Sequence, residues 1–331
     1  MAVVSAIIPT WNRADLLRSI LTNLRAQTRP PDEIIVVDNG STDATPLVVR
    51  EFPVELVVFP ENRGFAVAVN EGIRHARGDW IFIVNNDVVL EPAWLERMLT
   101  SAEQESAAFA VGKLLRPDDP ALIDGSWDLI SRAAYAWRCG FERHDGSVWS
   151  TRRTISFAPM TAALFQRRVF EQIGSLETRF ESYYEDVDFG VRCALAGLQG
   201  IYEPAAIALH MSKTSLGKSS ARVIFLTARN QVLILAKYYP SRTLGRFAWP
   251  IAVGQFLSLC AAAKQGHLIA GLRGKWEALR LWSSFRQQSS PADERLIEAI
   301  FSESEREIHR LQRQIGFNPY WRLYFSLVRS A

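Results

Sequence analysis

Cysteine is scarce in this sequence of 331 residues: the three cysteines are Cys139, Cys193 and Cys260. Their wide spacing matches no metal-binding motif and their number is odd, so the sequence predicts reduced thiols in a reducing compartment rather than a disulfide framework. No signal peptide is expected either, because no positive charge precedes the apolar stretch from Ala2 to Ile8. We therefore expect a cytoplasmic location.

Two glycine-rich phosphate motifs are also absent. The turn after the first predicted strand does not contain G-x-G-x-x-G, the fingerprint of dinucleotide-binding domains, and the P-loop pattern G-x-x-x-x-G-K-[ST] does not occur in the chain. If the chain binds a nucleotide, we expect the nucleotide to be held by hydrogen-bonding loops and by one or two carboxylates.

Acidic side chains are nearly missing from residues 213–286, which contain twelve Lys or Arg and a single acid, Glu277. Residues 1–212 carry 20 basic and 28 acidic side chains, so the net charge of +3 conceals an asymmetry. Such an asymmetry indicates an anionic partner for the basic part, and nucleic acid and a membrane surface are the two general candidates. A basic face that is only solvated is the alternative.

No uncharged segment reaches the about 20 apolar residues that a membrane-spanning helix needs. The segment from Phe247 to Ala263 comes nearest, with seventeen residues that include Pro250. The next segment, Leu268 to Phe285, is basic and amphipathic, which is typical of helices that lie in a membrane interface. We expect the C-terminal part to sit on an anionic membrane surface, peripheral on the inner face of the cell membrane. A buried helix and a true span are the alternatives.

Four short apolar runs are predicted to be strands: Val3–Ile8, Glu33–Val37, Glu55–Phe59 and Trp80–Val84. A helical pattern follows each run. This strict alternation predicts an α/β fold with a doubly wound, mainly parallel sheet, because parallel strands need helical crossovers between them.

The expected domain organisation is a catalytic domain over residues 1–240, followed by a helical, basic, membrane-proximal extension over residues 241–331. Within the first domain, residues 116–156 are predicted to form irregular strands and loops. The scattered aromatic side chains of this segment are candidate contacts for the acceptor of a transferred group. Gly200 to Tyr202 and Ala206 to Leu209 are predicted to be two short strands.

Polar side chains stand at the ends of four predicted strands: Thr10 and Asn12, Asp38 to Asp43, Asn85 to Asp87, and His210. In an open α/β sheet, ligands bind outside the carboxyl ends of the strands, so we expect these side chains at one edge of one sheet. Mg²⁺ is usually held by one or two carboxylates together with substrate phosphates. Asp87 and His210 would complete such a shell for Mg²⁺ or Mn²⁺. A polar turn and a hydrogen-bonded, half-buried histidine are the alternatives.

Three acids in four residues, Glu185, Asp186 and Asp188, stand near the start of a predicted helix. Acids at a helix start complement the helix dipole, which is a sufficient reason for their presence. A carboxylate at this place would also accept a proton from an attacking hydroxyl, which is the role of a general base. Neighbouring acids raise the pKa of such a group and the helix N-terminus lowers it.

Five motifs, taken in order, carry a resemblance to a known family. They are Ile7 to Arg13, Val36 to Asp43, Glu61 to Phe65, Asn85 to Asp87 and Glu185 to Asp188. Over roughly residues 3–230, the chain resembles the inverting family 2 glycosyltransferases of the GT-A fold. It is most similar to the bacterial rhamnosyltransferase branch, whose metal motif often reads Asn-Asn-Asp.

The resemblance implies a role for each matching position. The residues implied to bind a nucleotide diphosphate sugar are Pro9, Thr10, Asn12, Asp38, Asn62, Gly64, Asn70, Asn85, Asn86 and Arg229. Asp87 would bind the metal ion, with His210 as its second protein ligand, and Asp186 would be the catalytic base. The commoner family motif is Asp-x-Asp, and the amide of Asn85 cannot supply the charge of the carboxylate that it replaces.

The resemblance implies metal-dependent transfer of a sugar, with inversion, to a hydroxyl of a glycan or lipid-linked acceptor in the synthesis of cell-surface polysaccharide. Rhamnose from dTDP-rhamnose is the expected donor sugar. A sugar-phosphate nucleotidyltransferase is one rival, but it should carry a glycine-rich, basic loop where Pro9 to Asn12 stands. A non-catalytic protein that binds a membrane surface or nucleic acid is the other, and the set Asp87, Asp186 and His210 argues against it. We expect no nucleic-acid partner.

Overall fold

A computed structural model describes residues 2–211, 220–287 and 293–329 of the chain. It contains two compact units. The first unit is Met1–Trp127 with Arg138–Ser212, and the second is Asp128–Trp137 with Lys213–Ala331. The chain thus passes between the units three times, and the domain boundary expected at residue 240 stays a prediction.

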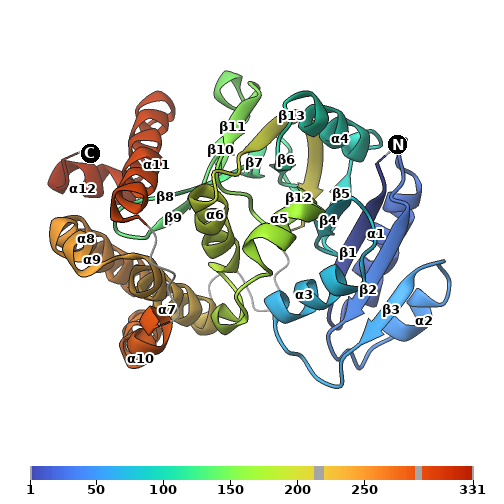
Figure 1. Ribbon diagram of the computed structural model, residues 1–331, viewed down its shortest axis with the longest axis horizontal. Helices are drawn as coiled ribbons and strands as arrows, with labels where there is room; N and C mark the ends of the chain where they lie inside the picture. The colour runs from blue at the N-terminus through green and yellow to red at the C-terminus, as the bar shows by residue number, and fades with distance from the viewer. Residues whose placement is uncertain (1, 212–219, 288–292, 330–331) are drawn as a thin grey trace. The chain divides into compact units, whose positions relative to one another are not determined.

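The first unit is built on a sheet that has eleven strands within the described residues. Its main path runs in the order β10-β7-β6-β12-β4-β1-β2-β3, and β13 lies off this path and pairs with β6, β5 and β11 (Figure 1). The strands are β1 (Val4–Thr10), β2 (Glu33–Asp38), β3 (Glu55–Val58), β4 (Trp80–Val84), β5 (Val88–Leu90), β6 (Phe109–Leu115), β7 (Leu122–Gly125), β10 (Arg143–His144), β11 (Arg153–Ile155), β12 (Ala162–Gln166) and β13 (Gly200–His210).

The strands β3, β2, β1 and β4 are parallel neighbours, which confirms the α/β class with a mainly parallel central sheet. Strand β12 is antiparallel to both β4 and β6, so β6 again runs parallel to β4. Strand β13 is parallel to β6 and therefore runs in the same direction as β1, β2 and β4. The carboxyl ends of these strands consequently lie at one edge of the sheet.

The two short strands predicted around residues 200–209 are one strand, β13. Its pairing register with β6 shifts between Glu203 and Ile207, because a bulge there takes up Pro204. Proline has no N–H for a ladder hydrogen bond and is found in sheets mainly at edges and bulges. The sequence pattern breaks at the bulge, but the strand continues through it to His210.

Helices cover both faces of this sheet, as the alternating pattern requires. The helices are α1 (Ala14–Arg25), α2 (Thr45–Val49), α3 (Phe65–His75), α4 (Trp94–Gln104), α5 (Arg167–Ile173) and α6 (Glu185–Leu195). Leu17 and Leu21 of α1 and Met98 of α4 share one core cluster with Ile8 and Phe82 of the sheet. Helix α3 packs against β1 and β2. The C-terminal ends of β1, β2 and β4 are thereby fixed on a rigid support.

The second unit is a group of helices with one hairpin (Figure 1). The helices are α7 (Ala221–Tyr238), α8 (Ser241–Arg246), α9 (Ala248–Lys264), α10 (Leu268–Gln287), α11 (Glu294–Ile315) and α12 (Pro319–Leu327), and the hairpin strands are β8 (Asp128–Ile130) and β9 (Ala136–Arg138). The helical C-terminal region is thus confirmed. Within residues 2–211, 220–287 and 293–329, we find no helix of the length and apolarity that crossing a bilayer requires.

The hairpin is joined to α11 and α12 by buried polar groups. The carboxylate of Glu305, which is fully buried, accepts hydrogen bonds from the backbone N–H of Arg132 (2.9 Å), from its Nε (2.9 Å) and from the hydroxyl of Tyr324 (2.8 Å). The Ser304 hydroxyl accepts the backbone N–H of Ile130 at 2.7 Å. A buried charge is stable only when it is paired and hydrogen-bonded, so these contacts specify where the hairpin packs.

Candidate functional site

The strand register of the first unit brings the predicted polar clusters to the same sheet edge. Thr10 at the end of β1 is opposite Asp38 at the end of β2. The Asn86 side chain, just past β4, donates from Nδ2 to the Thr10 hydroxyl at 2.9 Å. Asn85 is held by its backbone N–H, which donates to the carbonyl of Thr161 at 2.9 Å. Pro9 lies next to this edge within β1.

Three loops at this edge are joined by side-chain amides and hydroxyls. The Asn12 side chain accepts the backbone N–H of Thr42 at 2.7 Å, while Asp38, which is buried, accepts that of Ser41 at 2.9 Å. Asn39 donates from Nδ2 to the side-chain oxygen of Asn62 at 3.1 Å. The loops after β1, β2 and β3 therefore form one hydrogen-bonded frame.

Gly64 links this frame to the segment that leads to α6. Its φ of +89° lies in the region that only glycine adopts freely. A Cβ atom at this position would also come within 3.2 Å of the carbonyl oxygen of Glu181. A side chain at position 64 would thus push the loop after β3 away from the segment before α6.

Asp87 and His210 meet because β5 follows Asp87 directly and pairs with β13, with Val88 opposite His210. Asp87 Oδ1 lies 3.4 Å from His210 Nε2. The other ring nitrogen, Nδ1, is 2.6 Å from Oδ2 of the buried Asp124 on β7. The carboxylate of Asp124 holds a proton at Nδ1, as is usual for a metal-binding histidine, and Nε2 is the ring nitrogen that faces Asp87.

The pKa of His210 is raised above its ordinary value. Burial alone would lower this pKa, but the hydrogen bonds and charges of Asp124 and Asp87 outweigh it. Two carboxylates around one imidazole therefore favour positive charge at this point. No group of three or more His, Cys, Asp or Glu side chains able to hold a metal occurs among the described residues. A cation here would need further ligands from a substrate.

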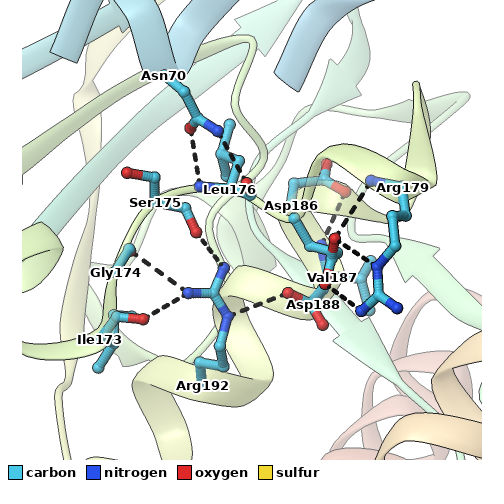
Figure 2. Close-up of polar contacts among 11 residues, drawn as sticks. Asn70, Ile173, Gly174, Ser175, Leu176, Arg179, Asp186, Val187, Asp188 and Arg192 are labelled. Carbon is cyan, nitrogen blue, oxygen red and sulfur yellow. Dashed lines mark hydrogen bonds and ion pairs between the residues drawn. The ribbon is translucent and has the colours of Figure 1, made fainter. Parts of the chain in front are cut away.

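Asn70 and Arg229, both predicted to bind the nucleotide sugar, form hydrogen bonds within the protein. Both polar atoms of the Asn70 amide are hydrogen-bonded to the backbone of Leu176, each at 2.9 Å (Figure 2). This amide therefore fixes the segment before α6. Arg229 is a buried residue of α7 in the second unit and donates from Nε to the Asn230 side chain at 2.9 Å. The predicted ligand contacts of both residues stay predictions.

The three acids of α6 differ in their surroundings, and Figure 2 shows two of them, Asp186 and Asp188. Asp188 is fully buried and forms an ion pair with Arg192 at 3.0 Å, and Arg192 also donates to the carbonyls of Ile173 and Ser175. Glu185 is buried too, and its Oε2 has no hydrogen-bond partner. Asp186 is half-buried, and its Oδ1 accepts the backbone N–H of Val187 at 2.8 Å. Of the three, Asp186 is the least buried residue.

Glu185 and Asp186 influence each other's pKa. Burial raises the pKa of Glu185 well above its ordinary value, and the charge of Asp186 raises it further. Burial also raises the pKa of Asp186, but the nearby Arg138 guanidinium opposes that rise. The two neighbouring acids therefore favour a state in which the pair carries one proton, and the Arg138 guanidinium favours the charged form of Asp186.

The backbone before these acids is strained. Glu181, Tyr183 and Tyr184 have φ angles of +63°, +66° and +71°. Positive φ is uncommon for residues other than glycine and costs free energy, and such residues cluster at functional sites. Here the strained segment directly precedes the carboxylate of Asp186.

Comparison with known proteins identifies the family. Residues 5–174, more than half of the chain, match the family model described as glycosyl transferase family 2. The chain belongs to glycosyl transferase family 2. Its similarity to an N-acetylglucosaminyl-diphospho-decaprenol L-rhamnosyltransferase of Mycobacterium tuberculosis is 27% identity over 260 residues, 71% of this chain and 84% of the relative.

Two solved structures share the fold of this glycosyltransferase. One is a mannosyltransferase from Pyrobaculum calidifontis in complex with GDP-Man and Mn²⁺, with a TM-score of 0.53 and 21% identity, covering 92% of this chain and 87% of that one. The other is GalNAc-T7 with UDP, GalNAc and Mn²⁺, with a TM-score of 0.62 and 11% identity, covering 96% of this chain and 59% of that one. The predicted GT-A architecture is confirmed.

Family membership shows that the protein is a transferase enzyme, and it removes the nucleotidyltransferase and non-catalytic alternatives. Sequence reasoning missed Asp124 and did not single out Asn39. Asp124 lies 86 positions from His210 in a region of short strands, so no local pattern indicates their contact. Two of the aromatic residues expected to contact an acceptor are core residues instead. Trp127 and Trp149 are buried against each other, with ring centroids 5.6 Å apart.

Proposed function

We propose that this glycosyltransferase moves rhamnose from dTDP-rhamnose to a hydroxyl of a glycan or lipid-linked acceptor, with inversion, in the synthesis of cell-surface polysaccharide. The similarity to a mycobacterial L-rhamnosyltransferase supports the sugar and the class of acceptor. The observation that carries the proposal is the Asp87–His210–Asp124 array at the carboxyl edge of the sheet, beside the frame of loops after β1, β2 and β3.

Asp87 and His210 fit a divalent metal ion. They offer one carboxylate and one imidazole nitrogen, and Asp124 orients the imidazole from behind. Two protein ligands are typical where substrate phosphates complete the shell of Mg²⁺ or Mn²⁺. When bound, the ion would neutralise charge on the departing diphosphate. The Mn²⁺ in both structural neighbours is consistent with this cofactor.

The remaining site residues would bind the donor and accept the proton. Thr10, Asn12, Asp38 and Asn62 belong to the loop frame, where base and ribose of the donor would bind. Asp186 would accept the acceptor proton while the acceptor oxygen forms its bond to the anomeric carbon and the bond to the diphosphate breaks. This single displacement inverts the anomeric centre and needs no enzyme nucleophile, in contrast to the retaining glycosidases.

We further propose that the enzyme works as a peripheral protein on the inner face of the cell membrane. The name of the mycobacterial relative contains diphospho-decaprenol, the diphosphate of a long-chain prenol. The apolar chain of such a lipid resides in a membrane. The excess of basic residues over 213–286 would attract the anionic membrane surface.

The donor is tested by thermal unfolding with a panel of nucleotide sugars and Mg²⁺ or Mn²⁺. A ligand that binds only the folded state stabilises it by about 2.7 kcal/mol at 100 times its Kd. This corresponds to a rise in Tm of several degrees, at roughly 2–4 °C per kcal/mol for a domain of 150–250 residues. We expect dTDP-rhamnose to give the largest rise and EDTA to remove it. A larger rise with another donor would contradict rhamnose, and no rise with any donor would contradict nucleotide-sugar binding.

Asp124→Asn should weaken metal binding, because an amide no longer holds the Nδ1 proton of His210 as a carboxylate does. Mutation of a residue that orients a metal ligand in this way typically lowers metal affinity by roughly 10–100-fold. The measurement is a Mn²⁺ titration followed by electron paramagnetic resonance in the presence of donor. Asp118→Asn is the matched control, since Asp118 is an exposed residue of the same region that pairs with Arg116. Equal Mn²⁺ affinity of both variants would show that Asp124 does not orient the ligand.

A further inference from the structure

Four large apolar side chains of helix α10 point outward. Ile269, Leu272, Trp276 and Leu279 recur every three or four residues and therefore share one face of the helix. All four are exposed, Ile269 by 68% and Trp276 by 66%. We refer to these four residues as the apolar stripe. A contiguous apolar surface of this kind indicates an interaction site rather than an ordinary solvated face.

The buried side of α10 includes the small residues Gly271, Gly274 and Ala278, and their close packing prevents the stripe from turning inward. A Cβ atom at Gly274 would lie 2.3 Å from the carbonyl oxygen of Phe225 on α7, and one at Gly271 would lie 3.2 Å from the Leu259 side chain on α9. The α10 backbone thus packs directly against its neighbours. A rotation that buried the stripe would drive Trp276 or Leu272 into this close contact.

The charges next to the stripe are mainly positive, with Glu277 as the one acid, which pairs with Arg280 at 3.6 Å. Arg273 and Arg280 are exposed and stand four residues after Ile269 and Trp276, so each lies beside a member of the stripe. Residues 241–286 contain seven Lys or Arg and one acid. A second copy of the chain on this face would bring like charges together, whereas an anionic lipid surface would be complementary to them.

We propose that the apolar stripe of α10 enters the interfacial layer of an anionic membrane, with Arg273 and Arg280 against lipid phosphates. Interfacial helices combine these features, and tryptophan is enriched at this depth. The neighbouring α9 exposes two more large rings, Trp249 and Phe256. The inference rests on the proposed function and deepens it, because it names the surface that would bring the enzyme to a lipid-linked acceptor.

The test is flotation of the full chain with phosphatidylcholine vesicles that contain or lack phosphatidylglycerol. We expect wild type to float with the anionic vesicles, and the double variant Leu272→Ser/Trp276→Ser to partition at least about tenfold less, given the free energy of transferring two large side chains from water. The matched control Leu47→Ser/Val58→Ser makes the same kind of change at exposed residues of the first unit and should float like wild type. Arg273→Glu/Arg280→Glu should reduce binding to the anionic vesicles.

Failure of wild type to float, or equal flotation of the two serine variants, would overturn the proposal. Sedimentation of wild type and the stripe variant gives a second readout. A dimer that the stripe variant loses would assign this face to a second copy and would also overturn it. The donor-induced rise in Tm keeps the two proposals separate. If flotation depends on the stripe but no donor raises Tm, the lipid face stands and the proposed reaction fails.

Discussion

Asp87→Ala is expected to lower the rate of sugar transfer by roughly 10³-fold or more, and to remove the effect of metal on donor binding. Asp87 is the carboxylate that β5 and β13 bring against His210, and neither neighbouring amide, Asn85 nor Asn86, can replace its charge. A Lewis-acid metal contributes several kcal/mol to stabilising transition-state charge. About 1.36 kcal/mol corresponds to a factor of ten in rate.

The measurement is kcat/KM for transfer, with donor binding measured in Mn²⁺ and in EDTA. Asp87→Asn should behave like Asp87→Ala while it keeps the volume of the side chain. Asp79→Asn is the matched control, because Asp79 precedes the same strand at its other end and accepts the backbone N–H of Val3. Full activity of wild type in EDTA, or of Asp87→Ala, would remove the metal from the mechanism.

Asp186→Asn is expected to lower the chemical step by roughly 10²–10⁴-fold, the usual range for a general base, with little change in donor affinity. The group must be ionised to accept a proton, and its pKa is raised by burial. The rate of wild type should therefore fall with decreasing pH through a pKa above the usual range of aspartate. Single-turnover kinetics as a function of pH measures both effects.

The neighbouring acids are the controls for this assignment. Glu185→Gln should retain activity within a few-fold, because burial and the charge of Asp186 raise the pKa of Glu185 and favour its neutral form, which the amide resembles. Asp188→Asn should lower Tm rather than the rate, because it breaks the buried ion pair with Arg192. If Glu185→Gln abolishes turnover while Asp186→Asn is mild, the base is Glu185.

The sheet edge could be predicted from sequence because its signals are local. Each apolar run ends in a polar cluster, and parallel strands place such ends together, as Thr10 and Asp38 show. The contact of Asp87 with His210 followed from the same rule. The partners that orient the site could not be predicted in this way. Asp124 reaches His210, and Asn70 reaches Leu176, across 86 and 106 positions of sequence.

Composition alone also gave no sign that residues 128–137 belong with the C-terminal helices. This segment lies among the short strands of the first unit in sequence, and its assignment depends on contacts with Glu305 and Ser304. Helix α10 is the opposite case. Its amphipathic character was visible in the sequence, but only the packing of Gly271 and Gly274 shows which face is exposed.

The buried pairing of Arg132 with Glu305 has a consequence for the order in which the enzyme is made. The two residues are 173 positions apart. At about 5–20 residues per second, the carboxylate leaves the ribosome roughly 10–35 s after the guanidinium that it neutralises. The strands of the first unit can pair within that interval, but the hairpin must wait. A nascent chain arrested before Glu305 would expose an unpaired cation and uncovered aromatic rings, which makes it a substrate for chaperones and proteases rather than a shorter enzyme.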